Sequence, residues 1–178
     1  MILSVHLIIG AAIANKIHNK FIAYPLAFLS HFVLDMIPHH DYDATGHFHG
    51  WKSLKFWLFI LKVELDFAIG LWLILLIAGN QNNFTQILIG AFLGTLPDLL
   101  SGVAHRIRGF NFQRCIRGES IKIEVGNENT SSSLHKISSA YIRFHNEKIQ
   151  NAFSKKKVHI LMGIFNQIIV AVIGLLLL

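Results

Sequence analysis

Long apolar stretches separated by short polar segments constrain this chain more than any other feature of its sequence. Five of them can be drawn, over about residues 2–17, 21–37, 51–79, 84–104 and 158–178. A helix needs ~20 residues to cross ~30 Å of hydrocarbon, and the third and fifth stretches meet that length. The first two are shorter, and form either a hairpin of short spans or a re-entrant pair. We take them as spans, which predicts an all-α, polytopic membrane bundle of about five helices.

The scarcity of charge supports the same class. Charged residues make up 15% of the chain and hydrophobic residues 53%, whereas a soluble domain carries about 25% charged residues. Cys115 is the single cysteine, which excludes an intrachain disulfide and a cysteine-based zinc site. The chain divides into residues 1–104, with four helices and a polar loop at 38–50, a basic linker at 105–157, and a last helix at 158–178.

Basic residues set the expected orientation. The chain has 16 Lys and Arg residues, and 11 of them lie between Arg106 and Lys157. Positive charge marks the cytoplasmic side of a membrane protein, so the linker is predicted to be cytoplasmic. Its part at 134–153 has apolar residues at helical spacing between basic ones, which predicts an amphipathic helix on the membrane surface. Membrane lipid is thus the expected partner, and no nucleic acid is expected. The sequence does not indicate an oligomeric state.

Histidine and aspartate gather on that same side. His31 and Asp35 are four residues apart, so their side chains share one face of a helix. Pro38 ends this helix and lets His39 or His40 turn back towards the pair, with Asp43 close behind. Imidazole and carboxylate groups are ligands for zinc or manganese. The pattern therefore predicts a metal site at the cytoplasmic edge of the bundle.

Three further residues are predicted to join this site. Asp98 follows Pro97 near the cytoplasmic end of the fourth stretch, where it would bind metal or orient a ligand. His6 begins the first stretch at a similar depth, and Asp66 lies inside the third. Ionisable groups inside apolar helices usually serve function. Gly90 and Gly94, by contrast, form a small-residue face expected to pack helices.

The chemistry expected of this site is hydrolysis. We expect Asp35 and Asp98 to be the catalytic carboxylates, and a metal-activated water to be the attacking group. Zinc is the expected metal, with manganese or magnesium as alternatives. The groups expected to bind substrate are His49, in the polar loop, and His105, Arg106 and Arg108, just after the fourth stretch.

The segment Ser30-His31-Phe-Val-Leu-Asp35-Met-Ile-Pro38, with His6 and the Leu96-Pro97-Asp98 element, resembles the bacterial inner-membrane metal-dependent hydrolase family. The HxxxD pattern followed by proline and histidine is similar to that of the zinc-dependent phospholipase C and single-strand nuclease superfamily. The resemblance implies a multi-pass inner-membrane protein and a site with two or three metal ions. It also implies cleavage of phosphoesters.

Two functions use these residues in different ways. The first is a membrane-embedded hydrolase that cleaves a phosphoester of a lipid or lipid-linked substrate at the cytoplasmic leaflet. The alternative is a divalent-cation transporter or sensor with the same cluster. A transporter needs ionisable groups through the depth of the membrane, whereas those of this chain gather at one edge, with Asp66 the deepest candidate.

Overall fold

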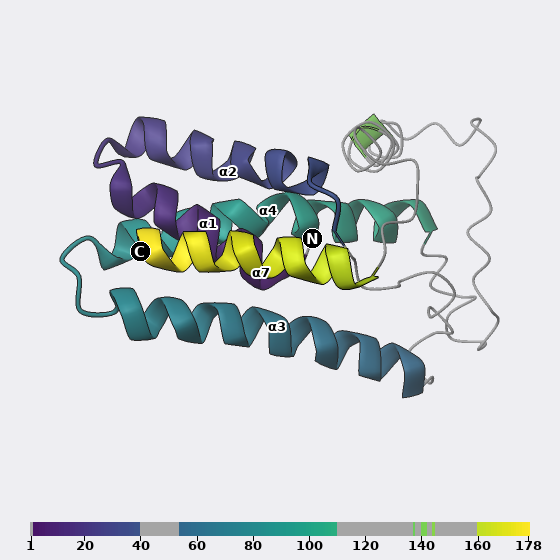
Figure 1. The fold of residues 1–178 in the computed structure, drawn as a ribbon. Coiled ribbons are helices and arrows are strands. Elements are labelled where there is room, and N and C mark those ends of the chain that lie inside the picture. Colours follow the sequence, from purple (N-terminus) through teal and green to yellow (C-terminus); the bar gives the residue numbers. More distant parts are fainter. Residues whose placement is uncertain (1, 40–53, 110–136, 138–139, 142–143, 145–159) are drawn as a thin grey trace.

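Five helices are described for this chain in a computed structural model (Figure 1). The structure describes residues 2–39, 54–109, 137, 140–141, 144 and 160–178. The helices are α1 (Leu3–Lys16), α2 (Lys20–Met36), α3 (Leu54–Ala78), α4 (Phe84–Gly109) and α7 (Ile160–Leu177). These described residues include no strand. The all-helical prediction and the number of helices in the bundle are therefore confirmed.

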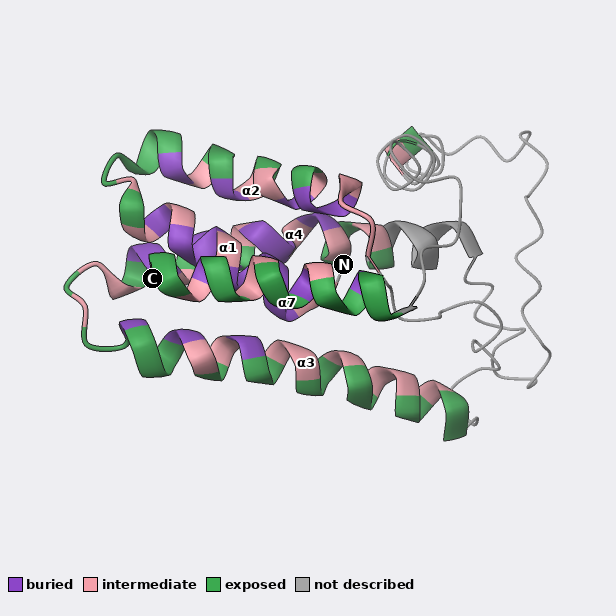
Figure 2. Ribbon diagram, in the orientation of Figure 1, coloured by how far each residue is buried: buried purple, intermediate pink, exposed green. Residues whose placement is uncertain are grey.

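Helix α1 occupies the centre of the bundle. It packs against α2, α3, α4 and α7, and nine of its 14 residues are buried. Figure 2 shows the buried residues concentrated on α1 and on the faces turned towards it. A helix that is apolar on all sides is suited to such a position. His6 is therefore enclosed by the bundle.

Neighbouring helices approach α1 through small residues. A Cβ atom added to Gly90 would meet the carbonyl oxygen of Gly10 at 2.6 Å, and one on Gly94 would meet that of His6 at 2.5 Å. On α7, a Cβ on Gly174 would lie 2.6 Å from a methyl group of Ile8. Side chains at these positions would push the backbones apart. The predicted packing role of the Gly90–Gly94 face is confirmed.

The contacts also give the helix directions. His31 and Asp35 near the end of α2 lie against His6 near the start of α1, so these two helices run in opposite directions. The turns Ile17–Asn19 and Gly79–Asn83 lie together at what we call the turn end of the bundle (Figure 1). The other end, where α1 begins, is the amino end.

Amide side chains hold the turn end together. The Gln86 side chain donates to the carbonyl oxygens of Ala14 (2.8 Å) and Ile17 (2.7 Å). Asn83 donates to the Oδ1 atom of Asn15 at 2.9 Å. The two Gln86 bonds satisfy backbone carbonyl groups that the end of α1 leaves without intrahelical donors.

When the described helices are judged by length and composition alone, fewer of them could span a membrane than the sequence predicts. Among the described residues, the segment Phe84–Gly102 is long and apolar enough to cross a membrane. Leu3–Lys16 and Leu161–Leu177 are shorter apolar helices. Helix α3 has sufficient length, but contains four charged residues, Lys55, Lys62, Glu64 and Asp66. The polytopic arrangement thus stays a prediction.

Candidate metal centre

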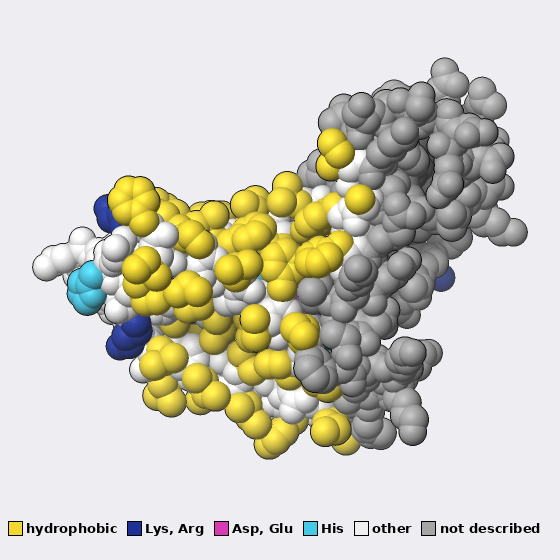
Figure 3. Space-filling model, turned by 90° about the horizontal axis from the view of Figure 1, so that it is seen from above, with side chains coloured by type: hydrophobic (Ala, Val, Ile, Leu, Met, Phe, Trp, Pro, Cys, Tyr) yellow, Lys and Arg dark blue, Asp and Glu magenta, His cyan; other side chains and the backbone are white. Residues whose placement is uncertain are grey.

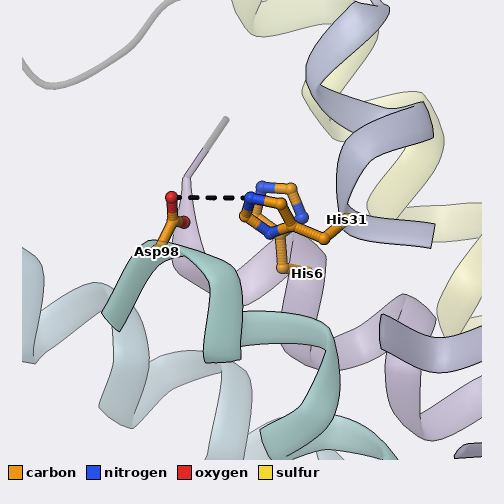
Figure 4. Close-up of side chains that lie close together, drawn as sticks. All are labelled: His6, His31 and Asp98. Atoms are coloured by element: carbon orange, nitrogen blue, oxygen red, sulfur yellow. Dashed lines mark ion pairs between the residues drawn. The ribbon is translucent and has the colours of Figure 1, made fainter. Parts of the chain in front are cut away.

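Four predicted site residues meet at the amino end of the bundle. They are His6 from α1, His31 and Asp35 from α2, and Asp98 from α4. Figure 4 shows three of them, with the two imidazole rings one over the other and the Asp98 carboxylate beside them. One ligand atom from each of His6, His31 and Asp98 can be chosen so that all lie within 4.8 Å of one another.

The Asp35 carboxylate lies between the two imidazoles. Its Oδ1 atom is 3.3 Å from His6 Nε2, and its Oδ2 atom is 3.2 Å from His31 Nε2. His31 Nε2 is also 3.6 Å from Asp98 Oδ1. Metal–ligand bonds of ~2.0–2.2 Å in a tetrahedral zinc site place neighbouring ligand atoms roughly 3.3–3.6 Å apart. The observed separations fall close to that spacing.

The ring of His31 is oriented by the backbone of α4. Its Nδ1 atom lies 3.1 Å from the carbonyl oxygen of Gly94. A carbonyl oxygen can only accept, so Nδ1 carries a hydrogen and donates it. Nε2 then points its lone pair towards Asp35 and Asp98. A histidine that donates one ring N–H to a backbone carbonyl and presents the other nitrogen is the usual arrangement of a metal ligand.

This arrangement brings hydrogen-bond acceptors together. The oxygens of Asp35 and Asp98 are acceptors, and so is Nε2 of His31 when the ring donates from Nδ1. A proton shared between these groups or a cation among them would relieve their repulsion. The His6 ring stacks on His31 with 4.2 Å between centroids, so protons on both rings would put like charges in contact. A single cation would place one positive charge beside both rings and the carboxylates.

Most of this cluster is buried. The side chains of His6, His31 and Asp35 are almost fully buried, whereas that of Asp98 is 28% exposed. Among the described residues, Nδ1 of His6 has no hydrogen-bond partner. Buried polar groups are normally bonded, and exceptions often mark a missing water or ion. The exposed edge of the cluster is at Asp98, which makes it the side that a small molecule would reach first.

Of the remaining predicted site residues, the structure describes the side chains of His39 and Asp66. The Nδ1 atom of His39 lies 2.6 Å from the carbonyl oxygen of Ile37, just after α2 ends. The Asp66 carboxylate accepts a hydrogen bond from the backbone N–H of Ser4. His40, Asp43 and His49 lie outside the described residues. His105, Arg106 and Arg108 belong to the last turns of α4, where side chains are not described.

Part of the predicted surface helix contacts the bundle beside this cluster. Of residues 134–153, those described are Ile137, Ala140, Tyr141 and Phe144, all helical. The Tyr141 hydroxyl donates to the carbonyl oxygen of Pro97 at 2.7 Å, and the Phe144 ring lies 5.8 Å from that of Phe32. Burial raises the pKa of the Tyr141 phenol, so its hydroxyl keeps its hydrogen at neutral pH. The placement of this segment on a membrane surface stays a prediction.

Sequence reasoning missed two groups that shape the cluster. Gly94 was expected only to pack helices, yet its carbonyl oxygen orients His31. The sequence could have placed Gly94 beside the cluster, because Gly94 and Asp98 are four residues apart and share one face of α4. Tyr141 lies 43 residues beyond Asp98 in the chain, and no local spacing connects the two.

Comparison with known proteins gives no assignment. No family model matches the chain, and no curated protein and no solved structure matches it either. The cluster of His6, His31, Asp35 and Asp98 is therefore the basis for any statement about function.

Proposed function

We propose that this chain is a membrane-embedded, metal-dependent hydrolase that cleaves a phosphoester of a lipid or lipid-linked substrate. One observation carries the proposal. His31 donates from Nδ1 to the Gly94 carbonyl and turns Nε2 towards the carboxylates of Asp35 and Asp98. A divalent cation is the species that this set of acceptors would bind. Imidazole nitrogen and carboxylate oxygen together suit zinc, and also manganese.

The exterior of the bundle supports a lipid environment. Large apolar side chains are more than half exposed along the outer faces, among them Phe21 (92%), Leu161 (70%) and Leu176 (79%). Figure 3 shows hydrophobic groups over most of the described part of one face, with a histidine and basic side chains on view near its ends. Soluble monomers rarely expose continuous apolar surface of this kind. Hydrocarbon around the helices would remove the cost of that exposure.

The position of the cluster favours a substrate at the membrane edge. His6 lies in the first turns of α1, His31 and Asp35 lie towards the end of α2, and the exposed member of the cluster is Asp98. A lipid headgroup lies at this level of a bilayer, while its acyl chains run beside the apolar helices. A metal ion in the cluster would lower the pKa of a bound water towards ~7 and polarise a phosphoryl oxygen. With such an ion held by His6, His31, Asp35 and Asp98, the hydroxyl of a water molecule would add to phosphorus as the ester P–O bond breaks, and the alcohol would leave with the proton from that water.

The transporter alternative is less well supported by the described residues. A path for cations needs acidic groups beyond the cluster. At the turn end, the amides Asn15, Asn83 and Gln86 are bonded to one another or to the backbone. The charged side chains described there are the basic Lys16 and Lys20. Asp66 is bonded to the start of α1 at the same end as the cluster.

Metal content is the first test. Protein purified in mild detergent from cells supplied with zinc and manganese should contain at least one divalent ion. The double variant His31→Ala, Asp35→Ala should lose most of it, because both groups belong to the cluster. Retention should also fall as the pH is lowered, since protons compete with metal for the imidazoles. A matched control is His18→Ala, which alters an exposed histidine at the turn end. Wild-type protein that holds no metal and takes up none would refute the proposal.

Activity is the second test. The purified protein should release phosphate, headgroup or diacylglycerol from phospholipids or lipid phosphates in mixed micelles with zinc or manganese. The His31→Ala, Asp35→Ala variant should be inactive at equal protein concentration. If no phosphoester is cleaved, yet reconstituted vesicles transport divalent ions in an Asp98-dependent way, the protein is a transporter.

A further inference from the structure

Asp66 was predicted to be a metal ligand, but its hydrogen bond to the backbone of α1 indicates a different role. It lies in α3, and its Oδ2 atom accepts a hydrogen bond from the backbone N–H of Ser4 at 3.0 Å. Ser4 is buried in the first turn of α1. The contact joins residues 62 positions apart and connects a peripheral helix to the start of the central one.

The first turn of α1 has no cap of its own. Its N-cap residue is Ile2, which makes no side-chain cap hydrogen bond, and the turn contains no acidic residue. The first four N–H groups of a helix have no acceptor within the helix. A carboxylate near this positive end is favourable. Asp66 therefore supplies from α3 the acceptor that the sequence around α1 lacks.

A glycine brings α3 close enough for this contact. Gly70 follows Asp66 by four residues and shares its face of the helix. A Cβ atom on Gly70 would lie 2.8 Å from the Cα atom of Ser4. The α3 backbone thus rests against the first turn of α1, and the Asp66 carboxylate reaches the Ser4 N–H one turn away.

His6 lies in the same helical turn as Ser4, whose N–H group donates to Asp66. It is the fourth residue of α1, two residues after Ser4. Terminal turns of helices fray first, and a shift of this turn would move His6 relative to Asp35 and His31. We propose that Asp66 is a positioning residue of the metal centre, acting through the Ser4 N–H to fix His6 against Asp35. The inference rests on the metal binding put forward above.

Metal affinity of purified variants tests this role, with Zn²⁺ and Co²⁺ as probes. Asp66→Ala removes the acceptor and should weaken binding by about 10- to 100-fold, the scale found for groups that orient ligands. Asp66→Asn keeps an acceptor oxygen and should stay within a few-fold of wild type. Glu64→Ala is the matched control, because Glu64 is exposed on the same helix and faces another way. Its affinity should be unchanged.

A double-mutant cycle separates positioning from general stability. In a His6→Ala background, Asp66→Ala should cause no further loss of affinity, because the ligand that it positions is gone. In metal-free protein, hydrogen exchange of a peptide covering residues 2–10 should be faster for Asp66→Ala than for Asp66→Asn. Asp66→Ser, too short to reach the Ser4 N–H, serves for both measurements should the alanine variant not fold.

The outcomes are distinct. If wild-type protein binds metal and Asp66→Ala or Asp66→Ser binds it equally well, the positioning role is wrong while the metal centre stands. An equal loss in the presence and absence of His6 also overturns it, since the effect would then be general. Wild-type protein that binds neither Zn²⁺ nor Co²⁺ overturns both proposals.

Discussion

Each ring nitrogen of His31 faces a group of a different kind. Nδ1 faces the Gly94 carbonyl, and Nε2 faces the carboxylates of Asp35 and Asp98. The pairing of His31 with Asp35 could be predicted, because four residues along a helix place two side chains on one face. The participation of Asp98 was predicted from its place after Pro97. The orientation of the ring could not be predicted, since it depends on a backbone atom of another helix.

Asp98 offers the clearest test at the scale of one residue. Asp98→Asn keeps the size of the side chain but removes its negative charge, so the amide would bind a cation weakly. We expect turnover to fall by at least 10- to 100-fold, the scale typical of lost ligand-orienting groups, while the protein remains folded and inserted. Measurement of kcat and KM in mixed micelles would check this. Activity close to that of wild type would show that Asp98 has no part in the chemistry.

The helices meet through α1, and this arrangement was only partly visible in the sequence. The five apolar stretches predicted the five helices with ends within a few residues of those observed. Gly90 and Gly94 were also recognised as packing residues. The central position of α1 was not predicted, because its apolar residues show no single face that would tell core from exterior. Helix α3 is likewise apolar, yet it lies at the periphery with α1 as its main neighbour.

Gly10 gives a test at the scale of the helix pair. In Gly10→Ala, the new Cβ would meet the backbone of Gly90, and neither backbone can yield without moving its helix. Overpacking of this kind costs about 1–3 kcal/mol, so the melting temperature in detergent should fall. Gly102→Ala on α4 is the control, because its Cβ would have no neighbour within 4 Å. A Gly10→Ala protein as stable as this control would contradict the close approach of α1 and α4.

The two ends of the whole molecule differ in chemistry. The cluster of His6, His31, Asp35 and Asp98 includes the first turns of α1, while the turn end carries neutral amides together with Lys16, His18 and Lys20. The sequence predicted this separation through the distribution of histidine and aspartate. It could not show which groups make contact, because His6, Asp35 and Asp98 are brought together by packing between helices that are distant in the chain.

Sidedness in the membrane is testable by cysteine labelling. In a Cys115→Ser background, single cysteines at Thr45 and Ser132 should share the cytoplasmic side, since the basic linker is predicted to lie there. A cysteine at Asn82, in the turn between α3 and α4, should lie on the opposite side. An impermeant maleimide added to whole cells should therefore label Asn82→Cys alone. Labelling of Thr45→Cys and Ser132→Cys instead would reverse the orientation, and labelling of only one would break the topology.

The central position of α1 has a consequence for the order of events during synthesis. This helix leaves the ribosome before its neighbours, yet it is completed by Asp66, Gly90 and Gly174, which follow much later. With 14 residues it is about 21 Å long, less than the ~30 Å of hydrocarbon. Until α4 and α7 have been synthesised, α1 and its His6 side chain lack part of their packing contacts. The packing of α1 can therefore be completed only after α3, α4 and α7 have been synthesised.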